Sequence, residues 1–120
     1  MDLKQAAKER IIIVAHRGEA GGNVPCNTIP AYKTALAQGA DMIEVDLNKS
    51  ADGTLWILHP KMEYRHLNYL GTEGKVSLPQ LTDEEIRKLR YVNYDRDYTQ
   101  FGLCTFDEVL DTFKDRCYIN

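Results

Sequence analysis

Residues 11–15 form a run that is apolar at every position, and this run constrains the fold more than any other stretch of the chain. A strand without polar alternation is typical of a sheet that is buried on both faces, as in parallel α/β proteins. The run ends in His16-Arg17-Gly18, and the glycine-rich residues 21–25 that follow have the composition of a loop. We therefore expect a buried strand that carries a histidine and an arginine at its carboxyl end.

A helix and a second strand follow this loop. Thr28, with Pro30 just inside, predicts a helix start, and Gly39 marks its end. The chain then returns through the strand-like residues 42–47. A strand, a helix and a strand within about 35 residues predict a βαβ unit with a right-handed crossover. The expected fold class is therefore α/β with a parallel sheet.

The second strand carries two carboxylates, Glu44 and Asp46, in an otherwise apolar run. Side chains alternate along a strand, so these two share one face, with Cα atoms about 6.5–7 Å apart. Such alternation is also typical of a half-exposed antiparallel strand whose acidic face meets water. Beside a buried parallel strand, however, the acids would point inward and need a cation or basic partners. The sequence favours a divalent metal site at this strand.

The middle of the chain contains a further strand. Asp52-Gly53 predicts a tight turn into residues 55–59, an apolar strand that ends in His59 before Pro60. Residues 61–80 show no clear period, and we interpret them as a long loop over the site.

The two ends of the chain contain further helix signals. Residues 1–10 predict a short helix or a frayed lead-in. Capping-box patterns at Thr82 and Thr105 predict two helices, separated by the irregular residues 91–102. Residues 117–120 have the pattern of a strand that is just beginning.

Charge and composition exclude several function classes. A net charge of -3 at pH 7 gives no electrostatic case for nucleic acid or an anionic membrane as partner. No apolar run is long enough for stable membrane insertion, and residues 1–10 lack the apolar core of a signal peptide. A chain that begins after a removed signal would look the same, so a periplasmic or secreted location stays open. Cys26, Cys104 and Cys117 are odd in number and widely spaced, which predicts free thiols.

The strand ends together carry a set of groups suited to phosphoryl transfer. Parallel strands place their carboxyl ends at one rim of the sheet, where α/β folds bind ligands. A hard cation on Glu44 and Asp46, with the guanidinium of Arg17, can share the charge of a phosphate. The imidazoles of His16 and His59 can take a proton from a nucleophile and return one to a leaving alkoxide.

Several short motifs occur in a specific order: His16-Arg17-Gly18, Pro25-Cys26-Asn27-Thr28, residues 39–46, Asp52-Gly53 and His59. In this order and spacing they resemble the N-terminal half of the glycerophosphodiester phosphodiesterase family. Residues 71–76, the helix start at Thr82 and residues 105–110 follow the same family's spacing, so the likeness covers nearly the whole chain.

This resemblance implies a fold, an activity and a set of roles. Family members are TIM (β/α)8 barrels that use Ca²⁺ or Mg²⁺ to hydrolyse glycerophosphodiesters to glycerol 3-phosphate and an alcohol. Carried over to this chain, it implies that His16 and His59 form the acid/base pair and that Arg17 holds the phosphate. Glu44 and Asp46 would bind the metal.

The chain departs from the family pattern at three points. Cys26 stands where the family usually has glutamate, so an acidic group is missing near the site. Pro60 stands where it usually has aspartate, which removes an interaction expected to orient His59. The family's third carboxylate ligand would lie beyond Asn120. Because a TIM barrel needs about 250 residues, we interpret residues 1–120 as the N-terminal part of one truncated domain, with two to three βα units and no activity alone.

Three other interpretations stay open. A phospholipase D-like lyase shares the barrel, the two histidines and the acidic ligands, but takes an intact phospholipid and forms a cyclic phosphate. A catalytically decayed barrel would bind phosphorylated ligands without turnover. A thiol nucleophile at Cys26 is a further alternative, although no base lies beside it in the sequence. None of these patterns specifies an oligomeric state.

Overall fold

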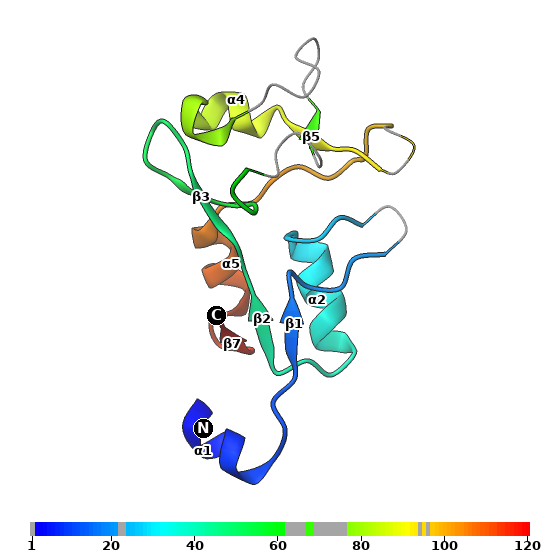
Figure 1. The fold of residues 1–120 in the computed structure, drawn as a ribbon, viewed down its shortest axis with the longest axis vertical. Coiled ribbons are helices and arrows are strands. Elements are labelled where there is room, and N and C mark those ends of the chain that lie inside the picture. Colours follow the sequence, from blue (N-terminus) through cyan, green and yellow to red (C-terminus); the bar gives the residue numbers. More distant parts are fainter. Residues whose placement is uncertain (1, 22–23, 62–66, 69–76, 94, 96) are drawn as a thin grey trace.

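The computed structural model describes residues 2–21, 24–61, 67–68, 77–93, 95 and 97–120 (Figure 1). The helices are α1 (Leu3–Glu9), α2 (Ile29–Ala37), the 3-10 helix η1 (Leu78–Gln80), α4 (Asp83–Arg87) and α5 (Phe106–Phe113). The strands are β1 (Val14–His16), β2 (Met42–Glu44), β3 (Leu47–Lys49), β4 (Leu55–Ile57), β5 (Leu67–Asn68), β6 (Arg90–Tyr91) and β7 (Tyr118–Ile119).

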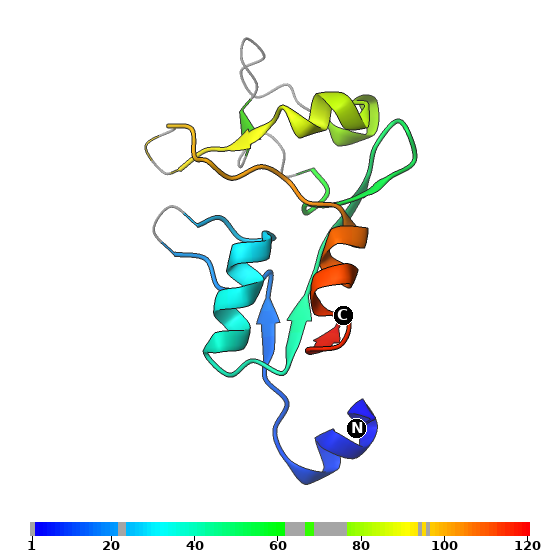
Figure 2. The same ribbon diagram turned by 180° about the vertical axis from the view of Figure 1, so that it is seen from behind.

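A three-stranded parallel sheet in the order β1-β2-β7 forms the centre of the fold. The strand β1, the helix α2 and the strand β2 make the predicted βαβ unit, and β7 is the strand predicted at residues 117–120. Tyr32 of α2 and Phe113 of α5 meet edge to face, with ring centroids 5.9 Å apart. Both rings join a buried cluster with Ile43 of β2 and Ile57 of β4, so α2 and α5 share one core with the sheet (Figures 1 and 2).

Side-chain caps explain where the main helices begin. The hydroxyl of Thr28 accepts a hydrogen bond from Ala31 N at 3.3 Å, and Pro30 lies in the first turn of α2. Thr105 and Glu108 form a reciprocal capping box at the start of α5. Thr82 caps α4 by accepting from Glu85 N. The sequence-based helix starts are therefore confirmed at all three positions.

The predicted burial of residues 11–15 on both faces is wrong. The regular strand β1 covers only the end of this run, and the exposed fractions are 85% for Ile11, 56% for Ile13 and 47% for Val14. The strand β1 pairs with β2 along one edge, and no strand of the described residues pairs with its other edge. An apolar run is buried only where other elements pack against it, and the described part of the chain leaves Ile11, Ile13 and Val14 largely uncovered.

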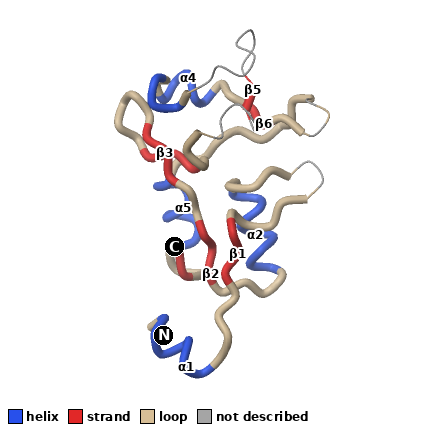
Figure 3. Tube along the Cα trace, in the orientation of Figure 1, coloured by secondary structure: helices blue, strands red, loops and turns tan. Residues whose placement is uncertain are grey.

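The strand predicted at residues 42–47 is divided between two sheets (Figure 3). Its first half, β2, lies in the parallel sheet, and its end enters β3, which pairs antiparallel with β4. The strand that carries His59 therefore belongs to an antiparallel hairpin, and its placement in the parallel sheet is a wrong expectation. The hairpin turns at Gly53, whose φ of 88° is accessible to glycine, as the Asp52-Gly53 pattern predicts.

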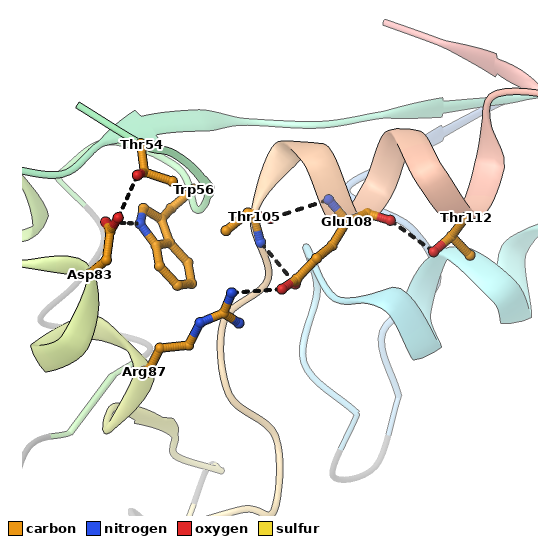
Figure 4. A network of polar contacts seen from close by, with 7 residues as sticks. All are labelled: Thr54, Trp56, Asp83, Arg87, Thr105, Glu108 and Thr112. Carbon is orange, nitrogen blue, oxygen red and sulfur yellow. Dashed lines mark hydrogen bonds and ion pairs between the residues drawn. The ribbon is translucent and has the colours of Figure 1, made fainter. Parts of the chain in front are cut away.

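A polar network joins this hairpin to the two following helices (Figure 4). The carboxylate of Asp83 accepts hydrogen bonds from the hydroxyl of Thr54 and from the buried indole nitrogen of Trp56, the latter at 3.0 Å. The guanidinium of Arg87 lies 4.7 Å from the Trp56 ring centroid and pairs with Glu108 at 2.7 Å. The network therefore connects the start of α4, the hairpin and the cap of α5.

The predicted loop at residues 61–80 contains short regular elements where the structure describes it. The strand β5 pairs antiparallel with β6, and η1 precedes α4. Residues 62–66 and 69–76, which include most of that predicted loop, lie outside the described residues. Residues 97–102 are largely irregular, as expected, apart from an isolated bridge between Val92 and Tyr98.

The N-terminal residues form the helix α1, which the sequence left open between a helix and a frayed segment. Arg10 then makes a bidentate ion pair with Asp41, at 2.7 and 2.8 Å, which joins this segment to the start of β2. Across the described part of the chain, no helix has the length and apolar character that spanning a membrane requires. All three cysteines are free thiols, as predicted, and burial raises the pKa of each.

Candidate active site

The register of β1 against β2 places the first two candidate residues side by side. His16 pairs with Glu44 in the parallel ladder, and both lie at the carboxyl ends of their strands. The Nε2 atom of His16 lies 3.9 Å from Oε2 of Glu44. The His16 side chain is 73% exposed, so its imidazole is open to solvent and to a ligand.

Arg17 contacts both carboxylates from a left-handed backbone conformation. Its φ is 60°, and its backbone N–H donates to the carbonyl oxygen and to Oε2 of Glu44, each at 3.1 Å. The guanidinium Nε lies 2.9 Å from Oδ2 of Asp46. The two groups form an ion pair at this distance, but they do not form a hydrogen bond, because the Nε–H bond does not point at an acceptor. One residue therefore brings Glu44 and Asp46 into the same cluster, as the strand alternation predicted.

The fifth candidate, His59, makes no hydrogen bond or ion pair with the other four candidates, and only the backbone of its neighbour contacts this region. Its neighbour Leu58 donates a hydrogen bond from N to the carbonyl oxygen of Asp46 at 3.1 Å, so the end of the hairpin lies beside the acidic residue. The imidazole Nδ1 lies 2.8 Å from the carbonyl oxygen of Pro60. Because a carbonyl only accepts, this contact requires a proton on Nδ1 and leaves Nε2 of neutral His59 as an acceptor.

Two positions depart from the family pattern, and the structure describes both. At Pro60, the backbone carbonyl supplies a partner for His59, although the usual aspartate is missing. At Cys26, burial raises the thiol pKa, and the neighbouring Arg17 guanidinium lowers it only in part. A raised pKa keeps the thiol protonated at neutral pH, which opposes the alternative of a Cys26 nucleophile.

The donor set of the two acidic residues fits a divalent cation with a partial protein shell. Glu44 and Asp46 use one carboxylate oxygen each in the contacts above, and their other oxygens make no hydrogen bond or ion pair with the described residues. Across the residues that the structure describes, no group of three or more histidine, cysteine or acidic side chains is placed to hold a metal. Mg²⁺ commonly binds through one or two carboxylates, with water and substrate phosphate as further ligands.

The structure adds a residue that the sequence analysis did not assign. The Asn27 side chain donates from Nδ2 to Oδ2 of Asp46 at 3.0 Å, and its oxygen accepts from the Tyr32 hydroxyl at 2.7 Å. Both residues are buried. The available signal was the position of Asn27 directly before a helix-capping threonine, where asparagine readily adopts a left-handed backbone conformation.

The fold and this cluster define the chain as an α/β protein whose candidate site lies at the carboxyl ends of adjacent parallel strands. The model of the glycerophosphoryl diester phosphodiesterase family matches residues 16–120. The chain therefore belongs to the glycerophosphoryl diester phosphodiesterase family.

Individual relatives agree with this assignment. The chain is 32% identical over 111 residues to a glycerophosphodiester phosphodiesterase of Caldanaerobacter subterraneus subsp. tengcongensis, covering 92% of this chain and 43% of the relative. It is 35% identical over 114 residues to one of Bacillus subtilis, covering 88% and 37%. A crystal structure of the Agrobacterium tumefaciens enzyme matches with a TM-score of 0.77 and 30% identity, covering 92% and 46%. The chain thus spans less than half the length of these relatives.

Proposed function

We propose that this chain is the N-terminal part of a metal-dependent phosphodiesterase that hydrolyses glycerophosphodiesters to glycerol 3-phosphate and an alcohol. The single observation that carries the proposal is the convergence of Arg17 on Glu44 and Asp46, with His16 beside them at the strand ends. Fixed positive charge, paired carboxylates and an open imidazole are the groups that phosphodiester cleavage requires. Family membership supports this substrate class.

Each candidate residue has a role consistent with its contacts. Arg17 makes an ion pair with Asp46 through its guanidinium, and the N–H donors of that group suit phosphate oxygens. His59 has the tautomer that leaves Nε2 free to accept a proton from the nucleophile. The exposed imidazole of His16 is suited to return a proton to the leaving alkoxide.

Glu44 and Asp46 would hold the divalent cation, Ca²⁺ or Mg²⁺, through the carboxylate oxygens that make no hydrogen bond with a described residue. When bound, the cation would supply charge neutralisation at the phosphate. The full protein would be a (β/α)8 barrel, of which this chain supplies the first parallel strands. The similarity to a solved family member over 92% of the chain supports this fold.

The test uses a chimera in which residues 1–120 replace the matching segment of the Agrobacterium relative. Phosphorus NMR would follow glycerophosphocholine in CaCl2 or MgCl2. We expect release of glycerol 3-phosphate by the chimera and no turnover by the 120-residue chain alone. His16→Ala should lower kcat by about 10²–10⁴-fold. Arg17→Lys should mainly raise KM, because lysine keeps the charge but loses the planar fork.

Other results would redirect the proposal. A cyclic phosphate product from lysophospholipid would indicate the lyase reaction. Binding of glycerophosphocholine without turnover by a folded chimera would indicate a decayed, phosphate-binding barrel. Unchanged turnover after His16→Ala, with Lys33→Ala on the exposed face of α2 as control, would refute the acid/base assignment.

A further inference from the structure

The buried amide of Asn27 links a helix hydroxyl to the acidic site. Asn27 is 2% exposed and Tyr32 is 0% exposed. Burial raises the pKa of Tyr32 well above its ordinary value, so its phenol keeps a proton to donate. An ionised Asp46 can only accept, so Nδ2 of Asn27 must face it and Oδ1 must accept from Tyr32. Both partners therefore fix the orientation of the amide.

The backbone of Asn27 holds the other member of the site's ion pair. Its N–H donates to the carbonyl oxygen of Arg17 at 2.8 Å. Both residues have left-handed backbone conformations, with φ of 58° for Asn27 and 60° for Arg17. Asparagine is among the few residues besides glycine that adopt this region readily. Asn27 thus contacts Asp46 with its side chain and Arg17 with its backbone.

These contacts determine which oxygen of Asp46 remains for a ligand. Oδ2 of Asp46 lies 3.0 Å from the amide of Asn27 and 2.9 Å from Arg17 Nε. Oδ1 makes no hydrogen bond or ion pair with any residue that the structure describes. A hydrogen bond and an ion pair on the same oxygen restrain the rotation of the carboxylate about its Cβ–Cγ bond, so Oδ1 has a preferred direction.

We propose that Asn27 and Tyr32 are positioning residues, which orient the Asp46 carboxylate so that Oδ1 can bind the divalent cation. The inference rests on the proposed function, because that function assigns the cation to Asp46. Tyr32 acts through Asn27, and Asn27 acts through Asp46. Partners of this kind behind a metal ligand commonly change metal affinity by about 10–100-fold when removed.

Two substitutions separate this role from a purely structural one. Tyr32→Phe removes only the hydroxyl and keeps the ring that packs against Phe113. Asn27→Gly removes the amide while glycine tolerates the left-handed backbone. Thr34→Val is the matched control, since it deletes a hydroxyl from the same helix whose only partner among the described residues is the carbonyl oxygen of Pro30.

The experiment uses the chimera with the Agrobacterium relative, titrates it with CaCl2 and with MgCl2 by isothermal calorimetry, and records the side-chain amide signals of Asn27 by ¹⁵N NMR without metal. We expect Asn27→Gly to weaken Ca²⁺ binding about ten-fold or more. Tyr32→Phe should shift the Asn27 amide signals and weaken binding by a smaller factor. The double variant should match Asn27→Gly alone, because the hydroxyl acts only through the amide. Thr34→Val should leave both measurements unchanged.

Different failures lead to different conclusions. If the unsubstituted chimera binds the cation and both variants bind it equally well, the positioning role is refuted while the proposed function stands. If Tyr32→Phe leaves the Asn27 amide signals in place, the hydrogen-bonded link itself is refuted. If the unsubstituted chimera binds neither Ca²⁺ nor Mg²⁺, the cation assignment in the proposed function is refuted and this inference with it.

Discussion

The glycine that follows the candidate arginine offers the sharpest test of how the site is built. Gly18 has a φ of 80° and lies against the first turn of α2. A Cβ atom at this position would lie 2.8 Å from the carbonyl carbon of Ala31 and 3.0 Å from its carbonyl oxygen. Ala31 is fully buried, so the helix backbone has no free space into which it can move. Gly18→Ala should therefore be destabilising.

The size of this effect follows from two separate contributions. A left-handed backbone costs a residue with a Cβ atom about 1–2 kcal/mol. Inserting a carbon into a packed contact costs about 1–3 kcal/mol more, because backbone atoms must shift. We therefore expect Gly18→Ala to lower the free energy of unfolding by about 2–5 kcal/mol, a large fraction of the stability of a typical domain.

Two other glycines separate the backbone contribution from the packing contribution. Gly39 has a φ of 104°, but a Cβ atom there would meet nothing within 4 Å. Gly39→Ala should therefore show the backbone contribution alone, about 1–2 kcal/mol. Gly21 has neither a positive φ nor a neighbour within 4 Å of an added Cβ atom, so Gly21→Ala should change stability by less than about 0.5 kcal/mol.

Urea unfolding followed by tryptophan fluorescence is the assay. The chain has one tryptophan, Trp56, which is 1% exposed and should report unfolding by a red shift of its emission. If Gly18→Ala is no more destabilising than Gly39→Ala, the close contact with Ala31 does not limit packing. That result would refute the view that the turn after Arg17 is packed directly on α2.

Three further predictions concern a helix cap, an ion pair and a hydrogen bond of the buried tryptophan. Thr105→Ala should cost about 1 kcal/mol in urea unfolding because it removes the capping box, whereas Thr112→Ala, within the same helix (Figure 4), should cost less than about 0.5 kcal/mol. The Arg10 guanidinium lowers the pKa of Asp41 to about 2. The stabilisation by the ionised Asp41 carboxylate should therefore be complete above about pH 4 and be lost as the pH falls to about 2. Equal Tm values for wild type and Asp41→Asn at pH 6 would contradict this. Asp83→Ala should blue-shift the Trp56 emission, because a carboxylate that accepts from the indole N–H lowers the energy of the emitting state. An unchanged spectrum would argue against that hydrogen bond.

The parts of the site that the sequence predicted depend on local pattern. Adjacent strands of a βαβ unit pair in parallel, so the ends of β1 and β2 had to meet, and His16 lies opposite Glu44. Strand alternation predicted that Glu44 and Asp46 lie close together, and Arg17 does contact both, although Asp46 lies beyond the end of β2. The helix starts were equally predictable, because a capping side chain satisfies backbone donors a few residues away.

The errors concern properties that depend on distant partners. The apolar character of residues 11–14 indicates side chains that are suited to burial. Whether they are buried depends on which distant elements pack against β1. In the same way, the pattern of residues 42–47 is compatible with a parallel and with an antiparallel strand. Only the pairing partners determine where the parallel strand β2 ends and the antiparallel strand β3 begins. Periodicity describes a strand's faces and does not specify its neighbours.

The break between β2 and β3 has a consequence for the site. Val45 and Asp46 belong to neither strand, yet their backbones are fixed on both sides, since Val45 N donates to Asn120 O and Asp46 O accepts from Leu58 N. Asp46 therefore lies where the parallel sheet ends and the hairpin begins. That position lets its carboxylate reach Arg17 and Asn27 while its carbonyl holds the segment leading to His59. The irregular junction, which no periodic pattern could predict, joins the backbone of the segment before His59 to Asp46.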